Sequence, residues 1–393
     1  MTTDAGEPLD HRGALGGRVA RIGRGELEGP VRSVLDDPAA RVTAWRHEAV
    51  AYDFLNPASG GVYRFAGTAE THEGARGWSL ILKVTRSPDE ELGPAVDALG
   101  RAHRAALRWD RELLAYESGF LPALDGQLVA AACHGGSRGG DDTGWLWLED
   151  LGGGATGEWP LRRWELVARA LGAFNGGFLV RGVPEHEWLG RGWLRIWVEY
   201  VTPLHFARAL APGPVWEHAL VREAYPAALR ERLAALWRER EALLAAVESL
   251  PRTCSHLDAH RRNLFLRRGD APGRVVAIDW GQLGLAAPGE EITSTLVGTV
   301  ASGEAPAADA AALAATLYDG YLAGLRDAGW DGAERDVRLA FTASCGLRAF
   351  SILRLDVADD AARGQEAAAV LAAGAALARV LLDLGDEALA LLR

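Results

Sequence analysis

The chain has 393 residues and a formal net charge of −11, and 49% of its residues are hydrophobic. This length and apolar content allow two hydrophobic cores of ordinary size, so we expect two domains. An acidic surface repels nucleic acid and anionic membranes, and no stretch approaches the roughly 18 uninterrupted apolar residues of a membrane span. We therefore expect neither as a partner. Three widely spaced cysteines and a polar N-terminus indicate a reducing, cytoplasmic location.

The first 150 residues predict an arm followed by a small sheet domain. Residues 1–40 are glycine-rich and weakly patterned, which predicts a loose arm with a short helix. Residues 41–150 predict a β-rich domain with one helix, in which the first two strands form a hairpin through a turn at 56–61. The predicted strands are Ala49–Phe54, Val62–Phe65, Trp78–Thr85, Leu128–Cys133 and Trp145–Leu148, and the helical spacing covers Ala95–Ser118.

The glycine-rich segment Leu151–Ala155 is the best candidate for a domain boundary. The following domain, residues 151–393, is mainly helical but is interrupted by a loop and two short strands at 264–266 and 275–278. The expected fold class is therefore α+β, with a small antiparallel sheet domain before a larger helical one. The predicted helices cover 162–180, 214–249, 290–302, 306–328, 334–352 and 361–391.

Lys83 is the only lysine among 42 basic residues. A GC-rich coding bias explains the excess of arginine, and a chance lysine at a strand edge is the plain alternative. However, Lys83 lies within the apolar run Leu80–Val84, where an unpaired charge is costly. We interpret it as a position that needs a compact ammonium rather than a planar guanidinium.

The loop that interrupts the helical region contains His256, Asp258, His260 and Asn263, and Asp279 follows the second short strand. Phosphoryl transfer needs oxygen ligands for Mg²⁺, cations on the phosphates and a group that orients the attacking hydroxyl. Asp258 would orient the attacking hydroxyl and receive its proton. Asn263 and Asp279 offer the hard oxygen ligands that Mg²⁺ prefers. The alternative is a loop whose polar side chains only satisfy backbone groups.

These residues resemble the catalytic and metal-binding loops of the aminoglycoside phosphotransferase and choline kinase family, which are relatives of the protein kinases. The resemblance implies a bilobal protein-kinase-like fold that uses ATP and Mg²⁺. It implies that Lys83 contacts the α/β-phosphates and pairs with Glu112, with Glu117 as the alternative partner. Glu149 and Leu151 would lie in the hinge whose main-chain groups meet the adenine.

Further roles follow from the same resemblance. Ser59, Gly60 and Gly61 would cover the phosphates, although they form no full Gly-x-Gly-x-x-Gly motif and also fit a plain tight turn. His260 stands where protein kinases often carry a phosphate-contacting lysine, so we predict a catalytic role for it beside the alternative of loop packing. His256 resembles the loop-bracing histidine of the family.

Several side chains near these loops have two interpretations each. Arg261 and Arg262 either reach a phosphate or form salt bridges within the domain. Glu290 and Glu291 either face a cationic substrate or favour the start of a helix. The tryptophans and acids of the segment 185–216 either grip a sugar, a nucleoside or a cation, or pack helices together.

The predicted activity is transfer of the γ-phosphate of ATP to a hydroxyl of a small molecule. The span from Asp279 to the next predicted helix is too short for the activation segment of a protein kinase. A non-catalytic binding module with the same fold is the second functional class. A metal hydrolase is a third, but the sequence offers no cluster of carboxylates or histidines with the spacing of its metal ligands. Because the composition is typical of antibiotic producers, we expect an antibiotic or other natural product as acceptor, with a sugar, choline-like alcohol or amino alcohol of primary metabolism as the alternative. The sequence indicates neither the oligomeric state nor a preference between ATP and GTP.

Overall fold

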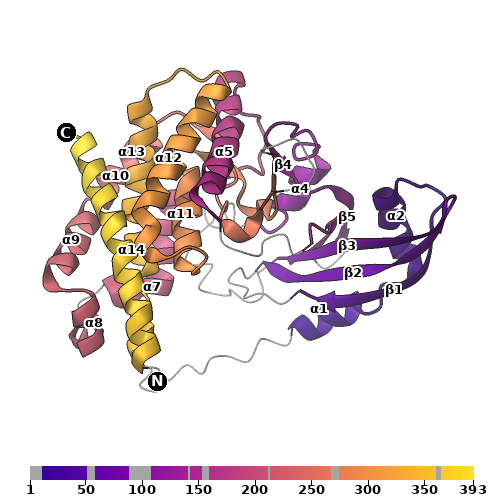
Figure 1. Cartoon of the computed structure of the whole chain (residues 1–393), viewed down its shortest axis with the longest axis horizontal. Helices are drawn as coiled ribbons and strands as arrows, with labels where there is room; N and C mark the ends of the chain where they lie inside the picture. The colour runs from indigo at the N-terminus through magenta and orange to yellow at the C-terminus, as the bar shows by residue number, and fades with distance from the viewer. Residues whose placement is uncertain are drawn as a thin grey trace. The chain divides into compact units, whose positions relative to one another are not determined.

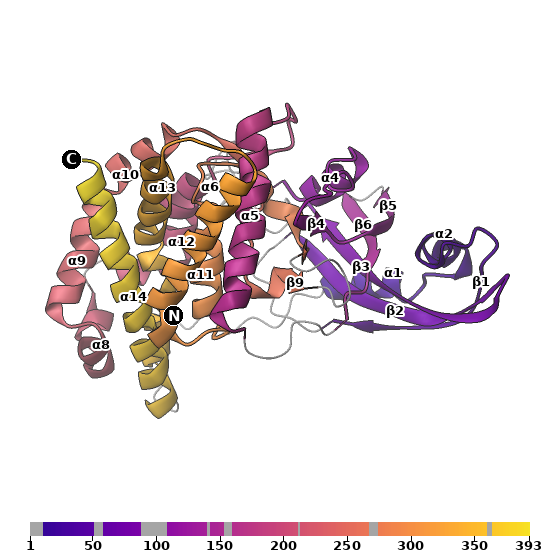
Figure 2. The ribbon, with the colours of Figure 1, turned by 45° about the horizontal axis from the view of Figure 1, so that its top comes forward.

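The computed structural model divides the chain into two compact units (Figures 1 and 2), and it describes residues 11–50, 58–87, 108–139, 142–152, 159–210, 213–266, 274–359 and 364–393. The first unit comprises Met1–Leu124 and Ala130–Gly153, and the second Asp125–Val129 and Gly154–Arg393. The chain passes from one to the other between Gly153 and Gly154, inside the glycine-rich segment. A sheet-based first unit and a helical second unit confirm the α+β class.

The first unit is built on a five-stranded antiparallel sheet with the order β1-β2-β3-β6-β5. Along β3 the alternate residues Leu80, Leu82 and Val84 are fully buried. Successive side chains of a strand point to opposite faces, so Lys83 lies on the other face of the sheet. The strands are β1 (Arg41–Ala49), β2 (Ser59–Thr71), β3 (Gly74–Arg86), β5 (Cys133–Gly139) and β6 (Thr143–Glu149).

Residues 11–35 do not form the expected loose arm. They form α1 (His11–Val19) and α2 (Arg24–Leu35), which contribute Leu15 and Leu27 to the same hydrophobic cluster as the core strands. Among its described residues, the first unit thus holds these two helices and α4 (Arg111–Glu117), where the sequence predicted one short helix in the arm and one helix in the sheet domain. The many glycines of this segment weaken the helical signal, and burial against the sheet decides the structure instead.

Two predicted strands of the first unit are displaced. The strand expected at Leu128–Cys133 is the shorter β4 (Leu128–Ala130), which pairs with β10 (Val275–Ala277) in a separate three-stranded sheet with β9 (Leu264–Leu266). The strand expected at Ala49–Phe54 is β1, which ends at Ala49. Residues 51–54 of that predicted strand, residues 56 and 57 of the predicted turn, and residues 95–107 of the predicted helix lie outside the described residues.

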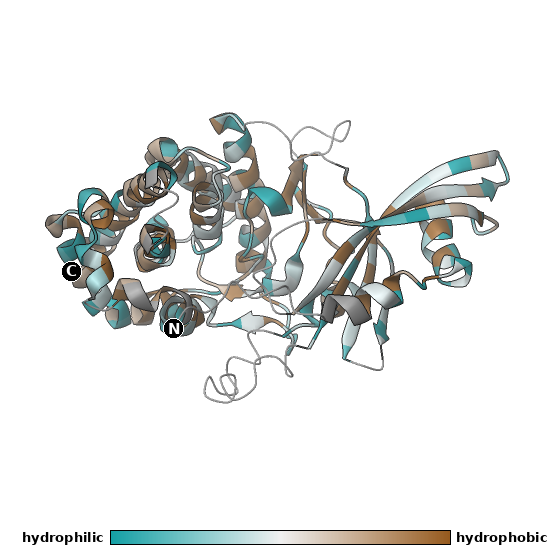
Figure 3. Cartoon of the chain, turned by 90° about the horizontal axis from the view of Figure 1, so that it is seen from below, coloured by the Kyte–Doolittle hydropathy of each residue, from teal (hydrophilic) through white to brown (hydrophobic). Residues whose placement is uncertain are grey.

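The second unit is a helical assembly with a small sheet of β7 (Gly190–Arg191), β8 (Thr253–Ser255) and β11 (Gly284–Ala286). Figure 3 shows hydrophilic and hydrophobic residues mixed along these helices. Between α5 and α12 the backbones meet so closely that a Cβ at Gly324 would overlap the carbonyl oxygen of Arg169, so only glycine fits there. The helices are α5 (Leu161–Arg181), α6 (Trp193–Ile196), α7 (Thr202–Leu210), α8 (Ala219–Ala224), α9 (Ala227–Arg238), α10 (Arg240–Glu248), α11 (Glu291–Ala301), α12 (Ala310–Asp327), α13 (Glu334–Leu347) and α14 (Gly364–Leu391).

The helix predicted over 214–249 is divided. It consists of a 3₁₀ turn at Pro214–Glu217 followed by α8, α9 and α10. Pro226 stands immediately before α9, where a proline starts a helix well but cannot continue the preceding one. The helices α5, α11, α12, α13 and α14 begin and end within a few residues of their predicted bounds, whereas α6 and α7 were not predicted.

Within the described part of the chain, α14 is the one helix that is long and apolar enough to cross a membrane, over Gln365–Leu391. One side of α14 buries Leu371 and Leu381, and its contacts are with α8, α9 and α13. The helix also carries exposed Asp383 and Asp386, which bind Arg232 at 2.7 and 2.6 Å. A packed helix of this composition passes the same length and hydropathy criteria, so we interpret α14 as a scaffold helix.

In the first unit, Asp37 and His72 join the connection after α2 to the turn between β2 and β3. The Asp37 carboxylate accepts hydrogen bonds from Nδ1 and the backbone N–H of His72, both at 3.0 Å, and from the N–H of Ala39 at 2.8 Å. The hydrogen bond from the His72 ring is the main cause that lowers the pKa of Asp37 to about 2. The same bond raises the pKa of His72 above 6.5.

We expect His72→Asn to lower Tm in a pH-dependent way. The raised pKa of His72 means that its stabilisation is complete below pH 6.5 and is lost as the pH rises through the folded-state pKa. The lowered pKa of Asp37 means that its part is present above pH 3.8 and is lost as the pH falls through about 2. The difference in Tm between wild type and variant should thus be largest between these limits and shrink in alkaline buffer. Exposed His218, which forms no ion pair in the described part of the chain, provides the control His218→Asn. A difference in Tm between wild type and His72→Asn that stays the same at high pH would contradict the assignment of the stabilisation to the His72–Asp37 pair.

Candidate active site

Lys83 on β3 and Glu112 on α4 form an ion pair in the first unit. Lys83 Nζ lies 2.5 Å from Glu112 Oε2, and the two side chains are only 12% and 1% exposed. Two charges withdrawn from water in this way stabilise the fold only while each satisfies the other. The alternative partner, Glu117, is 43% exposed and pairs with Arg138 at 3.2 Å. The structure thus brings together Lys83 and Glu112, as the resemblance implies.

Lys83→Arg is expected to weaken the binding of ATP·Mg²⁺ by about tenfold or more, the loss that corresponds to one charge-assisted hydrogen bond. The position beside Glu112 holds a compact ammonium, and a planar guanidinium cannot point one donor at Glu112 and another at a phosphate from the same place. Titration calorimetry with a non-hydrolysable ATP analogue measures the change. Arg76→Lys, at an exposed position of the same strand, is the control. If Lys83→Arg binds the ATP analogue with the affinity of the wild type, any cation at position 83 suffices for nucleotide binding.

Ser59, Gly60 and Gly61 open β2, beside the position of Lys83 in the sheet. The pairing of β2 with β3 shifts between Ser59 and Gly61, and Gly61 then lies opposite Val84. A Cβ at Gly60 would come within 2.9 Å of a Val84 methyl, and Gly61 has φ 126°, which other residues seldom adopt. Local packing and backbone conformation therefore require both glycines, and their contact with phosphate stays a prediction.

The chain around Glu149 and Leu151 is held by Asp150. Ser79 Oγ donates to the Asp150 carboxylate at 2.5 Å and Arg64 Nε at 2.8 Å. Burial raises the pKa of Asp150, but these bonds lower it further, so it stays ionised. The N–H of Leu151 donates no hydrogen bond to the described residues. Asp150 thus fixes this segment, and the contact of its main-chain groups with adenine stays a prediction.

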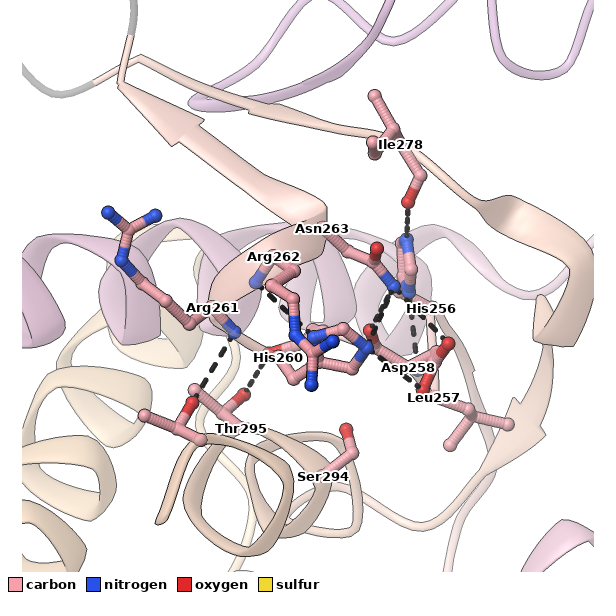
Figure 4. Close-up of polar contacts among 12 residues, drawn as sticks. His256, Leu257, Asp258, His260, Arg261, Arg262, Asn263, Ile278, Ser294 and Thr295 are labelled. Carbon is pink, nitrogen blue, oxygen red and sulfur yellow. Dashed lines mark hydrogen bonds and ion pairs between the residues drawn. The ribbon is translucent and has the colours of Figure 1, made fainter. Parts of the chain in front are cut away.

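In the second unit, the loop His256–Asn263 runs from the end of β8 to the start of β9 (Figure 4). Asn263 Nδ2 donates to the carbonyl oxygen of Asp258 at 2.9 Å and to its carboxylate at 3.2 Å. Thr295 Oγ1 on α11 donates to the carbonyl oxygen of Ala259 at 2.7 Å and ties the loop to that helix. The Asp258 side chain stays 26% exposed, so its carboxylate is accessible from solvent.

His256 is buried and braces this loop. Its Nδ1 accepts the N–H of Asp258 at 3.2 Å, so the proton is on Nε2, which donates to the carbonyl oxygen of Ile278 at 2.9 Å. Its ring packs against Trp280, with 4.5 Å between the ring centroids. His256 thus links Asp258 to the strand end that carries Asp279, which is the structural role expected of it.

A backbone hydrogen bond brings the chain at Asn263 close to the chain at Asp279, and the role of both residues as magnesium ligands stays a prediction. The N–H of Ile278, next to Asp279, donates to the carbonyl oxygen of Asn263 at 2.9 Å. Asp279 has φ 62°, an uncommon conformation for a residue other than glycine. Asn263 Oδ1 accepts no hydrogen bond from the described residues. One amide oxygen and one carboxylate fit Mg²⁺, whose other positions are usually filled by water and substrate phosphate.

His260 lies beside Asp258, with 3.9 Å between Nε2 and Oδ1. Burial, and then the charge of Arg262, lower the pKa of His260 below 6.5, although Asp279 opposes them. The imidazole is therefore neutral at physiological pH and does not replace the permanent charge of a lysine. A catalytic role for His260 stays a prediction, in the form of a neutral hydrogen-bonding group.

Glu291 is a residue of the site that sequence reasoning assigned differently. It is fully buried at the start of α11 and faces no substrate. Its carboxylate accepts the N–H groups of His256 at 2.7 Å and Leu257 at 3.1 Å. Leu257 has φ 65°, which costs energy for a leucine, and these two bonds hold it there immediately before Asp258. Burial raises the pKa of Glu291 to about 7, although both bonds oppose this.

The two arginines of the loop pack within the second unit. Buried Arg261 lies over the ring of Trp159 at 3.9 Å. Arg262 Nε lies 3.6 Å from a carboxylate oxygen of Glu304. Both contacts favour the interpretation of these cations as internal partners rather than phosphate ligands.

Comparison with known proteins places the chain among phosphotransferases. A family model described as "Phosphotransferase enzyme family" matches residues 68–334, more than half of the chain. No curated protein matches. A microcompartment-associated aminopropanol kinase has a similar structure, with 14% identity over 88% of this chain and 94% of that chain and a TM-score of 0.50, which supports a kinase-like fold.

Two further solved structures have a TM-score of 0.46. One is the amicoumacin kinase hAmiN in complex with AMP-PNP, Ca²⁺ and Ami, with 14% identity over 95% of this chain and 96% of that chain. The other is an aminoglycoside phosphotransferase from Alicyclobacillus acidocaldarius subsp. acidocaldarius DSM 446, with 15% identity over 92% and 96%.

Proposed function

Because the chain belongs to the phosphotransferase enzyme family, we propose that it transfers the γ-phosphate of ATP, bound with Mg²⁺, to a hydroxyl group of a small molecule. The observation that carries the proposal is the partly exposed Asp258 carboxylate, which Asn263 and the backbone bonds of the loop hold in one position. A rigid, accessible carboxylate next to two candidate magnesium ligands suits the orientation of a hydroxyl for attack on phosphorus.

The side chains divide the work as follows. Asp258 accepts a hydrogen bond from the acceptor hydroxyl and takes its proton as the new oxygen–phosphorus bond forms and the bond to ADP breaks. Asn263 and Asp279 would hold Mg²⁺, which supplies positive charge to the phosphates. Lys83, kept in place by Glu112, adds a cation for the α/β-phosphates. Glu291 and His256 keep the loop in shape.

For the acceptor we propose an antibiotic or another natural product, with resistance or self-protection as the role. The composition of the chain supports this. Phosphorylation of a sugar or amino alcohol in primary metabolism is the second candidate, and the similar aminopropanol kinase is the observation in its favour. Free Cys133, Cys254 and Cys345 suit the reducing cytoplasm, where ATP is supplied.

The experiment is a screen of antibiotics, amino alcohols and sugars with ATP and Mg²⁺, with mass spectrometry to detect the gain of one phosphate. We expect at least one acceptor to be phosphorylated, with one ADP formed for each product molecule. Tight nucleotide binding without ADP formation over the whole panel would support a non-catalytic binding module instead. The screen is repeated with GTP because the sequence does not indicate the base.

A further inference from the structure

A cavity in the second unit lies next to the residue that precedes Asp258. It is small, with about 20 Å³ of room and an opening to solvent, and its lining includes Leu257 of the loop. A cavity of this size can receive no more than one compact functional group of a ligand. The remaining lining comes from the segment after β7 and from helices α11 and α13, with polar side chains at Glu290, Thr293, Ser294, Ser344 and Arg348.

Three of the polar groups in this lining already have partners. Glu290 is paired with Arg252 at 3.3 Å. Ser294 Oγ donates to the carbonyl oxygen of Glu291 at 3.0 Å. Thr293 Oγ1 lies 3.6 Å from a cysteine sulfur. These groups are therefore poor candidates for the recognition of a ligand.

Two side chains of the lining, Ser344 and Arg348, have hydrogen-bond donors that the described residues do not use. The hydroxyl of Ser344 is buried and has no hydrogen-bond partner among the described residues. Arg348 forms no ion pair with any of those residues, and the one hydrogen bond of its side chain runs from Nε to Ser351 Oγ at 3.4 Å. A buried hydroxyl without a partner costs free energy, which a bound acceptor group would recover. Both groups can donate, so the cavity favours a ligand group that accepts.

The guanidinium of Arg348 is positioned by stacking. It lies over the ring of Trp197 at 3.7 Å, and stacking leaves the terminal N–H groups in the guanidinium plane available for a ligand. Trp197 begins a π-helical turn, Trp197–Val201, a rare geometry that occurs often at functional sites. Burial lowers the pKa of Arg348 to about 10, although Asp258 opposes this, so Arg348 remains charged at neutral pH.

We propose that this cavity binds an anionic group of the acceptor, a carboxylate or a phosphate monoester, through Arg348 and Ser344. The same molecule then presents its hydroxyl to Asp258, so the inference rests on the proposed function and specifies the acceptor as an alcohol with a compact anionic group. A planar guanidinium fork matches both anions with two parallel hydrogen bonds. A cationic acceptor would meet the positive charge of Arg348, while the carboxylate of Glu290 is already paired with Arg252.

Matched acceptors that differ only in the anionic group test this proposal. The pairs are glycerate with glyceramide, serine with serinamide, and glycerol phosphate with glycerol, each assayed with ATP and Mg²⁺ by mass spectrometry. In parallel, the rise in Tm that each compound causes is measured in the presence of a non-hydrolysable ATP analogue. We expect the anionic member of at least one pair to have a kcat/KM, or a binding constant, about tenfold or more above its neutral partner. The results for the two carboxylate pairs and for the phosphate pair show which of the two anions the cavity prefers.

Variants assign the preference to the side chains. Arg348→Gln should reduce the preference for the anionic member by about tenfold or more, and Ser344→Ala should reduce it by a smaller factor. Arg354→Gln removes the same charge from a 59% exposed arginine that pairs with Asp356, and should keep the preference. If Arg348→Gln does not fold, the wild-type protein assayed with the matched acceptors still tests whether the site prefers an anionic group.

The outcomes separate this inference from the proposed function. Phosphorylation of neutral or cationic acceptors in preference to anionic ones would overturn the anionic site and leave the phosphotransferase intact. The absence of turnover and of thermal protection for every anionic compound would overturn it as well. Failure of the wild type to bind ATP·Mg²⁺ at all would instead contradict the proposed function.

Discussion

Asp258→Asn is expected to lower kcat by about 10²- to 10⁴-fold, the usual contribution of a positioned general base. Asparagine keeps the size of the side chain but cannot take the proton of the acceptor hydroxyl. The loop bonds from His256 and Asn263 reach the backbone of residue 258, and the second Asn263 bond needs only an acceptor oxygen, which asparagine keeps. The loop and the affinity for ATP·Mg²⁺ should therefore be retained. Rapid-quench measurement of product formation reports kcat for the chemical step, and calorimetry reports the affinity.

The matched control for this variant is Asp356→Asn. Asp356 is 59% exposed and pairs only with its neighbour Arg354 among the described residues, so its replacement should leave kcat unchanged. A wild-type kcat in Asp258→Asn would remove Asp258 from the reaction. A kcat that falls together with nucleotide affinity would point to a collapsed loop rather than to a missing base.

Glu291→Leu is expected to lower the free energy of unfolding by about 2–6 kcal/mol, because the buried N–H groups of His256 and Leu257 each lose their acceptor at about 1–3 kcal/mol. The same change frees Leu257 from its left-handed conformation and moves Asp258, so kcat should fall as well. Urea unfolding measures the stability, and the assay above measures kcat.

Two further variants show whether the carboxylate acts through these bonds. Glu291→Gln keeps one acceptor oxygen and should fall between wild type and Glu291→Leu in both measurements. Glu334→Leu changes an exposed glutamate in the first turn of α13 and should alter neither by a comparable amount. Equal stability of Glu291→Leu and wild type would show that the loop holds its conformation without this carboxylate.

The functional residues that the sequence predicted are those whose chemistry is local. Lys83 stood out as a single lysine in an apolar run, and Asp258, Asn263 and Asp279 by their types and spacing. The structure places Glu112 against Lys83, as the resemblance implied. It also places Asn263 against Asp258, a contact that the sequence did not predict.

The elements that the sequence did not predict depend on contacts that are distant along the chain. Helices α1 and α2 are stabilised by the contact of their apolar residues with the sheet, which the sequence of residues 11–35 alone does not indicate. β4 joins β10, about 150 residues later, and no local pattern tells which sheet a three-residue strand will choose. Glu291 looked like a helix-start acid, because the N–H groups that it binds belong to a loop far away in sequence. For the same reason, Arg348 and Ser344 carried no signal of their own.

The central claim is that an acceptor hydroxyl attacks the γ-phosphorus of ATP. The most direct measurement is a single-turnover reaction with ATP whose non-bridging γ-oxygens carry ¹⁸O, followed by mass analysis of the products. The account predicts one phosphorylated acceptor for each ADP, with all labelled oxygens in the new phosphate and the acceptor's own oxygen retained. Labelled inorganic phosphate as the sole product, or release of AMP in place of ADP, would contradict it.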